Sequence, residues 1–258
     1  MAQELGLVAE SGRRISSSGR SVFLLEPCSV VAKVGPSSEQ SRFTTEVDLA
    51  RHVQRRRGPV VPALLRANPG PHIRGELVIS FWEYAPSEVG DEELELAAPP
   101  TYTELRVHLD DFPGRLPSFS QPIQVCREVL ARDEVDGLSR PALRLVRRAL
   151  ETADSFEVPK ADLCVLHGDP HARNLTQSFG EVMWLDLKSA CRGPLEWDLT
   201  ALPAVGHFQA PKPERLATLR AVRSACVVVW CSQKPALEPH DREAIEYHLQ
   251  QLASAPTA

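Results

Sequence analysis

The alternation of apolar and polar residues in the first third of the chain predicts an antiparallel β-meander. Three short apolar or β-branched runs, "RRIS", "SVFLLEP" and "SVVAKVG", follow one another. They are separated by "SSGR" and "EPCS", whose residues are typical of tight turns. Runs of this length joined by such short turns are expected to pair as neighbouring strands.

Helical spacing appears directly after the meander. The apolar residues Phe43, Val47, Ala50 and Val53 recur every three or four positions, which predicts a helix over residues 39–56. Gly58-Pro59 is expected to end it. The next apolar run, "ELVISFWEYAP", predicts another strand over residues 76–84 that ends before Pro86.

The character of the sequence changes after this strand. "SEVGDEELELAAPP" is acidic and flanked by proline, which suits a connection between two lobes. Helical patterns dominate beyond it, at residues 102–111, 122–132, 140–155, 213–231 and 240–253. We therefore predict an α+β fold with a β-rich N-terminal lobe, residues 1–85, and a mainly helical C-terminal lobe, residues 86–258.

The stretch "VLHGDPHARNL" concentrates polar residues between two apolar runs, and a hairpin is predicted to follow it. Gly180 is the expected tip of that hairpin. Asn174 and Asp186 lie six residues on either side of Gly180, so the hairpin would bring their side chains together at its open end. An amide oxygen and a carboxylate meeting there make a hard-oxygen site suited to Mg²⁺.

Asp169 lies five residues before Asn174, in the loop that precedes the hairpin. A carboxylate in this place could accept a hydrogen bond from an incoming hydroxyl, beside a metal ion that holds a nucleotide's phosphates. Two side chains that bind a metal ion and a third that aligns a hydroxyl are the features expected of a phosphotransferase.

Two other interpretations of the polar stretch stay open. His167 and His171 are four residues apart, as in helical zinc sites, although Gly168 and Pro170 disfavour a continuous helix between them. The stretch could also be a polar turn without chemistry.

The chain also has a candidate for binding phosphate. Only 5 of the 29 basic residues are lysines, and one of these, Lys33, lies in the strand-like run "SVVAKVG". On its own it would be read as an edge residue at the surface. Glu46, however, lies on the core-facing side of the next predicted helix, where it could pair with Lys33 and orient it. The pair favours a role for Lys33 at the phosphates of a nucleotide.

Length and composition limit the class of protein. A chain of 258 residues with 43% hydrophobic and 24% charged residues can bury the core of one large domain or of two lobes. The start, "MAQELGLVAE", lacks the pattern of a signal peptide, and no run of about 18 apolar residues occurs. We expect a soluble cytoplasmic protein without a membrane partner. The six cysteines are scattered, which predicts reduced thiols in the core.

Charge is distributed unevenly between the two predicted lobes. Residues 1–85 contain 11 basic and 8 acidic residues, a net charge of +3. The remainder contains 18 basic and 26 acidic residues, a net charge of −8. An acidic larger part argues against nucleic acid as a partner and is compatible with a cationic small substrate.

Taken together, these residues resemble the aminoglycoside phosphotransferase and choline kinase family, which shares the two-lobed protein-kinase-like fold. "HGDPHARN" is similar to the family's H-G-D-x-x-x-x-N catalytic loop. "WLDLKSACRGPLEWDLT" resembles its second signature, an acidic residue after an apolar strand, then a Gly-Pro turn and Trp-Asp-Leu at the start of a helix. The likeness spans nearly the whole chain. It implies that residues 1–85 bind the nucleotide and that residues 86–258 form the catalytic and substrate-binding lobe.

The resemblance implies a role for each matching residue. Asp169 would be the catalytic base or orienting carboxylate, and Asn174 and Asp186 would hold Mg²⁺. Lys33 would hold the phosphates of ATP or GTP, with Glu46 as its partner. Backbone groups of a hinge would face the base of the nucleotide, namely those of Trp82, Glu83, Tyr84 and Ala85.

Other matching residues are expected to shape loops rather than react: His167, Gly193 and Asp198. Asp198 is expected to cap the helix that it begins. The sequence also departs from the pattern of kinases. It has no G-x-G-x-x-G between the first two strands, so only "SSSGR", with Ser18 and Gly19, could cover the phosphates. Leu187 rather than Phe-Gly follows Asp186, which argues against a protein kinase with an activation loop.

We therefore expect a small-molecule O-phosphotransferase that moves the γ-phosphate of ATP or GTP to a substrate hydroxyl. A basic antibiotic such as an aminoglycoside is the first candidate acceptor, with antibiotic resistance as the biological role. Carboxylates that could bind its ammonium groups are Glu196, Glu238, Asp241, Glu243 and Glu246. A metabolite alcohol such as choline, homoserine or a sugar is the alternative acceptor, and a catalytically silent kinase fold is the alternative to an enzyme.

Overall fold

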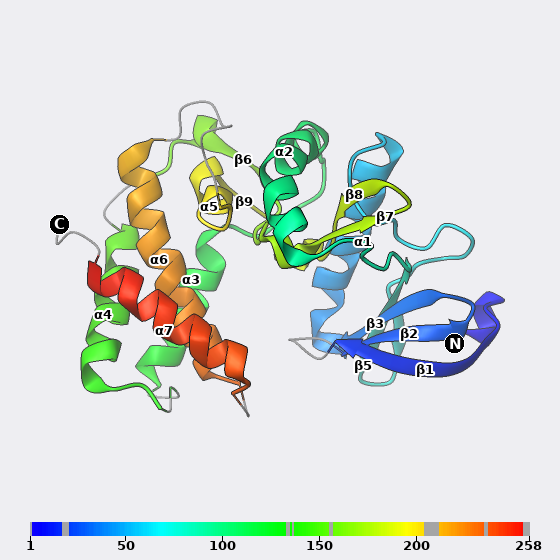
Figure 1. Ribbon diagram of the computed structural model, residues 1–258, viewed down its shortest axis with the longest axis horizontal. Helices are drawn as coiled ribbons and strands as arrows, with labels where there is room; N and C mark the ends of the chain where they lie inside the picture. The colour runs from blue at the N-terminus through cyan, green and yellow to red at the C-terminus, as the bar shows by residue number, and fades with distance from the viewer. Residues whose placement is uncertain are drawn as a thin grey trace. The chain divides into compact units, whose positions relative to one another are not determined.

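The computed structural model (Figure 1) describes residues 2–16, 21–132, 135, 137–154, 157–203, 212–234 and 237–254. They form two compact units. The first contains the described residues up to 116, together with residues 167–190 and 202–203. The second contains residues 117–166, 191–201 and the described residues from 212 onwards. Each unit combines stretches that are distant in sequence, and the predicted lobe boundary after residue 85 stays a prediction.

A five-stranded antiparallel sheet forms the first part of unit one. Its strand order is β1-β2-β3-β5-β4. The first three strands pair consecutively as in the predicted meander, and β5 pairs with both β3 and β4. The strands are β1 (Ala9–Ser16), β2 (Ser21–Pro27), β3 (Val30–Pro36), β4 (His72–Arg74) and β5 (Leu77–Glu83). The predicted strands are confirmed. The sequence did not indicate β4, because three residues are too few to show an alternating pattern.

Helix α1 (Gln40–Arg55) covers this sheet as the spacing of its apolar residues predicts. Phe43, Val47, Ala50 and Val53 are all buried. The helix approaches the end of β3 closely, because a Cβ atom on Gly35 would lie only 2.9 Å from the ring of Phe43. The approach places the buried face of α1 beside the strand that carries Lys33.

The acidic stretch after residue 90 is a helix and not the predicted connection. α2 (Asp91–Leu109) begins with three acidic residues, which interact favourably with the positive end of the helix dipole. Its core-facing side includes Leu94, Tyr102 and Leu105. The helix therefore begins at Asp91, eleven residues before the predicted start at residue 102. The two prolines that suggested a break lie inside the helix.

The predicted hairpin is present and completes unit one. β7 (Leu175–Ser178) pairs with β8 (Glu181–Trp184) through four consecutive residue pairs. Phe179 and Gly180 form the tip with positive φ angles of 55° and 78°, as a two-residue type I′ turn requires. The backbone N–H of Leu185 donates to the carbonyl oxygen of Asn174 at 2.7 Å, so Asn174 and Asp186 lie at the open end.

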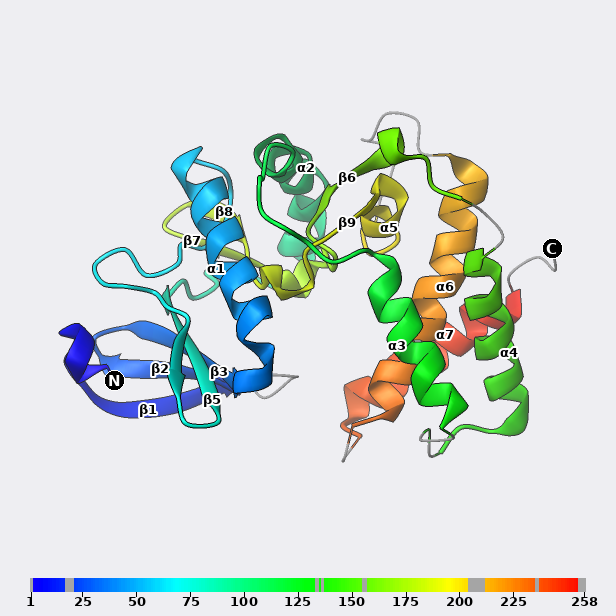
Figure 2. The ribbon, with the colours of Figure 1, turned by 180° about the vertical axis from the view of Figure 1, so that it is seen from behind.

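Unit two is mainly helical, and Figure 2 shows it from the opposite side. Its elements are α3 (Ser120–Ala131), α4 (Arg140–Glu151), β6 (Leu163–Leu166), β9 (Cys191–Pro194), α5 (Leu195–Leu199), α6 (Pro213–Ser232) and α7 (Pro239–Ser254). Helix α6 contacts α3, α4 and α7 and supplies much of the core through its valine and leucine residues. The predicted long helices are therefore confirmed, and so is the α+β fold class.

Two local expectations in unit two are wrong. The Gly-Pro pair belongs to strand β9, which pairs with β6, and is not a turn. Asp198 is not the N-cap of the following helix, because α5 already begins at Leu195 and Asp198 lies inside it, fully buried.

Two global features complete the description. All six cysteines are free thiols, and three of them, Cys126, Cys191 and Cys226, are buried as predicted, whereas the other three are partly exposed. Among the residues that the structure describes, no helix is both long and apolar enough to cross a bilayer.

Candidate active site

Strand β3 and helix α1 hold a buried ion pair. The ammonium nitrogen of Lys33 lies 2.5 Å from Oε1 of Glu46, whose side chain is fully buried. The same nitrogen lies 4.5 Å from the centre of the Trp82 ring, which adds a cation–π contact. The pair expected between Lys33 and Glu46 is therefore present, and it fixes the position of the ammonium group.

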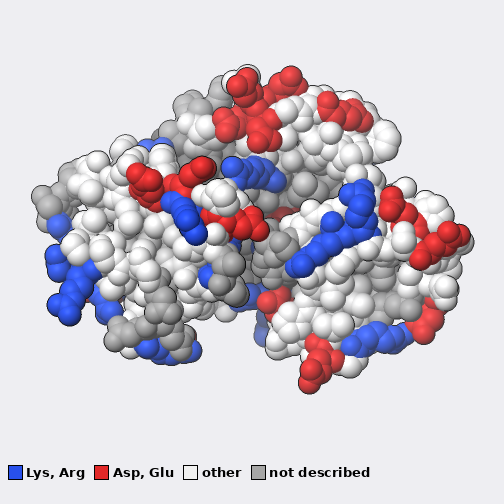
Figure 3. Space-filling view, turned by 60° about the horizontal axis from the view of Figure 1, so that its bottom comes forward, with Lys and Arg blue, Asp and Glu red and all other residues white. Residues whose placement is uncertain are grey.

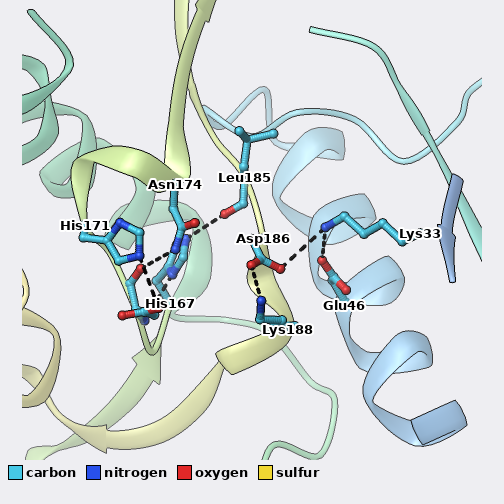
Figure 4. A network of polar contacts seen from close by, with 9 residues as sticks. Lys33, Glu46, His167, His171, Asn174, Leu185, Asp186 and Lys188 are labelled. Carbon is cyan, nitrogen blue, oxygen red and sulfur yellow. Dashed lines mark hydrogen bonds and ion pairs between the residues drawn. The ribbon is translucent and has the colours of Figure 1, made fainter. Parts of the chain in front are cut away.

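Asp186 faces this ammonium group from the end of the hairpin (Figure 4). Its Oδ1 lies 3.6 Å from Nζ of Lys33, and its Oδ2 lies 2.6 Å from Nζ of Lys188. Its backbone is left-handed, with φ 61° and ψ 57°, which is uncommon for a residue other than glycine. Burial alone would raise the pKa of Asp186, but Lys33 and Lys188 outweigh burial and hold that pKa below its usual value.

Asp169 lies in the loop after β6, and its backbone organises that loop. Its carbonyl oxygen accepts hydrogen bonds from the side-chain amide of Asn174 at 2.8 Å and from the backbone N–H of His171 at 3.0 Å. Its Oδ2 lies 3.4 Å from Nε2 of His171, and about a third of its side chain is exposed. The carboxylate is thus held by a short loop and remains accessible to a small molecule.

His167 is a buried structural residue of the same loop. Its Nδ1 accepts the backbone N–H of Asp169 at 3.3 Å, and its Nε2 donates to the carbonyl oxygen of Leu185 at 3.0 Å. The ring is therefore neutral with its proton on Nε2. Burial lowers the pKa of His167 to about 4, although the carboxylates of Asp169 and Asp186 act in the opposite direction. Since both ring nitrogens are used, this geometry does not support the zinc interpretation.

Gly168 allows the loop to press against the segment after Asp186. Its φ of +88° lies in the region that favours glycine, and a Cβ atom there would be 1.8 Å from the backbone oxygen of Ser189. No other residue fits this contact. The loop with Asp169 and the turn with Asp186 are thereby fixed to one another.

A cavity of about 300 Å³ lies beside these groups and is formed wholly by unit one. Its polar lining includes Lys33, Asn174 and Asp186. Its apolar lining consists of Ile15, Val22, Val31, Val61, Trp82, Ala85, Trp184, Leu185 and Leu187. A cavity lined by apolar side chains and by cations suits a ligand that carries both a flat ring and negative charge.

The predicted hinge residues also line this cavity: Trp82, Glu83, Tyr84 and Ala85. Two of their backbone groups already have partners, since the N–H of Glu83 donates to Pro62 and the carbonyl of Ala85 accepts from Thr176. Oε1 of Glu83 accepts the backbone N–H of Leu65 at 3.0 Å, which gives that side chain a structural role.

The other predicted site residues fall outside the lining. Asp169 and Glu46 each contact a lining residue: the backbone carbonyl of Asp169 accepts from the Asn174 amide, and Glu46 pairs with Lys33. Ser18 and Gly19, expected to cover the phosphates, lie outside the described residues.

The two predicted metal ligands fit a magnesium ion in donor chemistry. Asn174 and Asp186 line the same cavity, and Asn174 uses its amide nitrogen on Asp169, which leaves its amide oxygen for another partner. In the described part of the chain, no three or more His, Cys, Asp or Glu side chains gather as a metal cage would need. Two protein oxygens suffice for Mg²⁺ when phosphate oxygens and water supply the rest.

Two of the carboxylates expected to bind a cationic substrate are structural instead. Glu196 is buried and accepts the backbone N–H of Lys212 at 2.8 Å, with Arg215 at 3.2 Å. Asp241 is buried and lies 2.5 Å from Lys234. The remaining three, Glu238, Glu243 and Glu246, are exposed. Acidic and basic side chains are mixed across the face drawn in Figure 3.

Two cations of the cavity were not predicted from the sequence, Arg173 and Lys188. Arg173 is part of the catalytic-loop motif but carries no signal that separates it from an exposed arginine. Lys188 did carry a signal, because it is one of five lysines in the chain and follows Asp186 by two residues.

Comparison with known proteins gives the family whose model the chain matches. The model of the phosphotransferase enzyme family (APH) matches residues 11–226. A sequence comparison with curated proteins found no match.

Solved structures share the fold. A thermostable mutant of aminoglycoside phosphotransferase APH(4)-Ia has a TM-score of 0.70 at 13% identity, over 98% of this chain and 96% of that one. Choline kinase LicA from Streptococcus pneumoniae has a TM-score of 0.67 at 13% identity, over 98% and 97%. Aminoglycoside phosphotransferase APH(3'')-Id from Streptomyces rimosus has a TM-score of 0.56 at 20% identity, over 93% and 92%. These likenesses confirm the protein-kinase-like fold.

The environment of His167 predicts a pH dependence of stability. The pKa of His167 is about 4 in the folded protein and about 6.5 in the unfolded chain, so only the unfolded chain takes up a proton between these values. Neutral His167 therefore contributes fully to the free energy of unfolding above pH 6.5. This contribution, on the order of 3 kcal/mol, is lost as the pH falls towards 4. We expect the free energy of unfolding of the wild type to fall more steeply than that of His167→Asn over this window.

Chemical denaturation at pH 7, 5.5 and 4 measures this difference. A proton NMR titration of the His167 ring with a midpoint near 6.5 would contradict the assignment.

Proposed function

Because this chain belongs to the phosphotransferase enzyme family, we propose that it is a small-molecule kinase that transfers the γ-phosphate of ATP or GTP to an acceptor hydroxyl. The observation that carries the proposal is the convergence of Lys33, Asn174 and Asp186 on one cavity with an apolar slot. Asp169 is linked to this group through Asn174. A nucleoside triphosphate as co-substrate implies a cytoplasmic setting.

The nucleotide would lie with its base in the slot and its phosphates at the cations. Trp82 and the aliphatic side chains Val31 and Val61 would pack against the ring of the base. Lys33, held by Glu46, would contact phosphate oxygens and offset the charge that develops on them during transfer. Because the buried carboxylate fixes the ammonium group, little reorganisation is needed when the phosphates arrive.

Asn174 and Asp186 are the residues that would hold Mg²⁺. The ion would supply charge neutralisation at the β- and γ-phosphates. The amide of Asn174 already bonds to the backbone of Asp169, so the metal-binding residue and the proposed catalytic residue are coupled in position.

Asp169 would accept a hydrogen bond from the acceptor hydroxyl and align its oxygen with the γ-phosphorus. Its carboxylate is partly exposed and stands at the end of a loop fixed by Gly168 and His167. Positioning of this kind supplies much of the catalysis in phosphoryl transfer. The side chain would take up the hydroxyl proton as the new oxygen–phosphorus bond forms. The bond between the γ-phosphorus and the β–γ bridging oxygen breaks in the same transfer, and ADP or GDP leaves.

For the acceptor, we propose a hydroxyl compound that also carries an amine. The structural neighbours include an amicoumacin kinase, an aminopropanol kinase, a choline kinase and aminoglycoside phosphotransferases, each named for its own substrate. An aminoglycoside or another basic antibiotic is the first candidate, with resistance as the consequence. A metabolite amino alcohol such as choline is the second, because kinases of such compounds share the fold equally well.

A nucleotide-consumption screen tests the proposal. Release of ADP or GDP is measured with Mg²⁺ over a panel of aminoglycosides, other basic antibiotics, amino alcohols and neutral sugars. We expect acceptor-dependent release with an amine-bearing acceptor and none with neutral sugars. Nucleotide binding without release for any acceptor would point instead to a catalytically silent binding protein.

Loss of the Asp169 carboxylate should abolish transfer without abolishing nucleotide binding. Asp169→Asn keeps the size of the side chain but cannot accept the proton, so we expect kcat with the best acceptor to fall by at least about 100-fold. The dissociation constant of a non-hydrolysable nucleotide should change little. Asp48→Asn, at an exposed aspartate of α1, is the matched control. Retained turnover in Asp169→Asn would remove Asp169 from this role.

A further inference from the structure

Lys188 occupies a distinctive position in the cavity. Its ammonium nitrogen lies 2.6 Å from Oδ2 of Asp186, and about a third of its side chain is exposed. It lines the cavity together with Lys33 and Arg173. Two of the five lysines of the chain thus converge on a single carboxylate, one on each oxygen atom.

The two lysines are held in different ways. Lys33 is anchored by buried Glu46 and by the Trp82 ring, and only 12% of its side chain is exposed. Lys188 is more exposed, and within the described part of the chain Asp186 is its one ion-pair partner. A lysine on a flexible stem with one exposed partner can exchange that partner at little cost. Of the two lysines that contact Asp186, Lys188 is therefore the one whose ammonium group can leave the carboxylate.

A metal ion and Lys188 would compete for the same oxygen. A divalent ion at Asp186 needs a carboxylate oxygen, and Oδ2 is in contact with Lys188 (Figure 4). A nucleotide brings several negative charges into the same cavity, so an ammonium group displaced from Asp186 finds a new partner on a phosphate oxygen. The exchange keeps every charge paired.

We propose that Lys188 is a second phosphate-binding cation, which holds the Asp186 carboxylate in the nucleotide-free protein and passes to the phosphates when a metal ion takes that oxygen. This inference rests on the proposed function, since it needs a metal-bound nucleotide in the cavity. It assigns to Lys188 two separable effects. The residue suppresses metal binding by the empty site and strengthens binding of a phosphorylated ligand.

These two effects have opposite signs when Lys188 is replaced by a neutral residue. In Lys188→Met, Asp186 loses a competing cation, so the nucleotide-free protein should bind Mn²⁺ more tightly, by about fivefold or more. The same variant lacks a phosphate contact, so a non-hydrolysable triphosphate nucleotide should bind about tenfold more weakly. A lysine that only supports the local structure would weaken both kinds of binding or neither.

The experiment measures both constants on the whole chain. Electron paramagnetic resonance follows Mn²⁺ binding to the nucleotide-free protein, and calorimetry at fixed Mg²⁺ follows the non-hydrolysable triphosphate and the nucleoside without phosphate. Lys188→Arg keeps the charge and should resemble the wild type. Lys160→Met, at an exposed lysine of unit two, is the matched control and should change neither constant. Thermal unfolding checks that each variant is folded, and Lys188→Gln serves as a second neutral variant.

The outcomes separate this inference from the proposed function. Tighter Mn²⁺ binding with weaker triphosphate binding and unchanged nucleoside binding supports it. Unchanged constants in both neutral variants, while the wild type binds the triphosphate, overturn the role of Lys188 and leave the proposed function intact. A wild type that binds no triphosphate overturns the proposed function itself. In that case the Mn²⁺ arm still decides whether Lys188 competes for Asp186.

Discussion

The buried ion pair between Lys33 and Glu46 is the interaction on which the site depends. Glu46 is fully buried in the face of α1 that packs on the sheet, and a buried carboxylate is costly unless a cation accompanies it. Lys33 supplies that cation from β3, 2.5 Å away. Each charge therefore requires the other, and the sheet and the helix must stay in register for both to be satisfied. Removing one partner would leave the other unpaired, at a cost of about 3–5 kcal/mol.

The consequence is an ammonium group held at a defined place in a cavity with little freedom to move. Asp186 faces it from the hairpin, and Gly168 fixes the loop that carries Asp169 to the turn that follows Asp186. The lining contains three cationic side chains, Lys33, Arg173 and Lys188, and two carboxylates, Asp186 and Glu83. Lys33 and Lys188 both contact Asp186. The apolar lining provides a separate place for a ring.

Much of this arrangement could be predicted from local sequence. The strands, helix α1 and the hairpin follow from periodicity and from Gly180, and the hairpin alone placed Asn174 and Asp186 at one end. The pairing of Lys33 with Glu46 followed from the side of the helix on which Glu46 lies. These inferences succeed because each relies on contacts between neighbouring elements.

The failures come from features that local pattern does not encode. The acidic stretch at the start of α2 was predicted to be a connection because of its charges and prolines. The apolar residues of the same stretch, which form the buried face of the helix, were not taken into account. Asp198 and Glu196 looked like a cap and a surface carboxylate, yet tertiary packing buries both in unit two. Lys188 was overlooked because its importance comes from its contact with Asp186, which only the turn at residues 186–189 creates.

The central claim is that the ammonium group of Lys33 acts on the phosphates of a nucleotide. The most direct test is calorimetry of nucleotide binding to the double variant Lys33→Met/Glu46→Gln, in which the buried position is neutral and no charge is left unpaired. The account predicts that a non-hydrolysable triphosphate binds at least about tenfold more weakly than to the wild type, whereas the nucleoside without phosphates binds equally well. Equal affinity of both proteins for the triphosphate would contradict it.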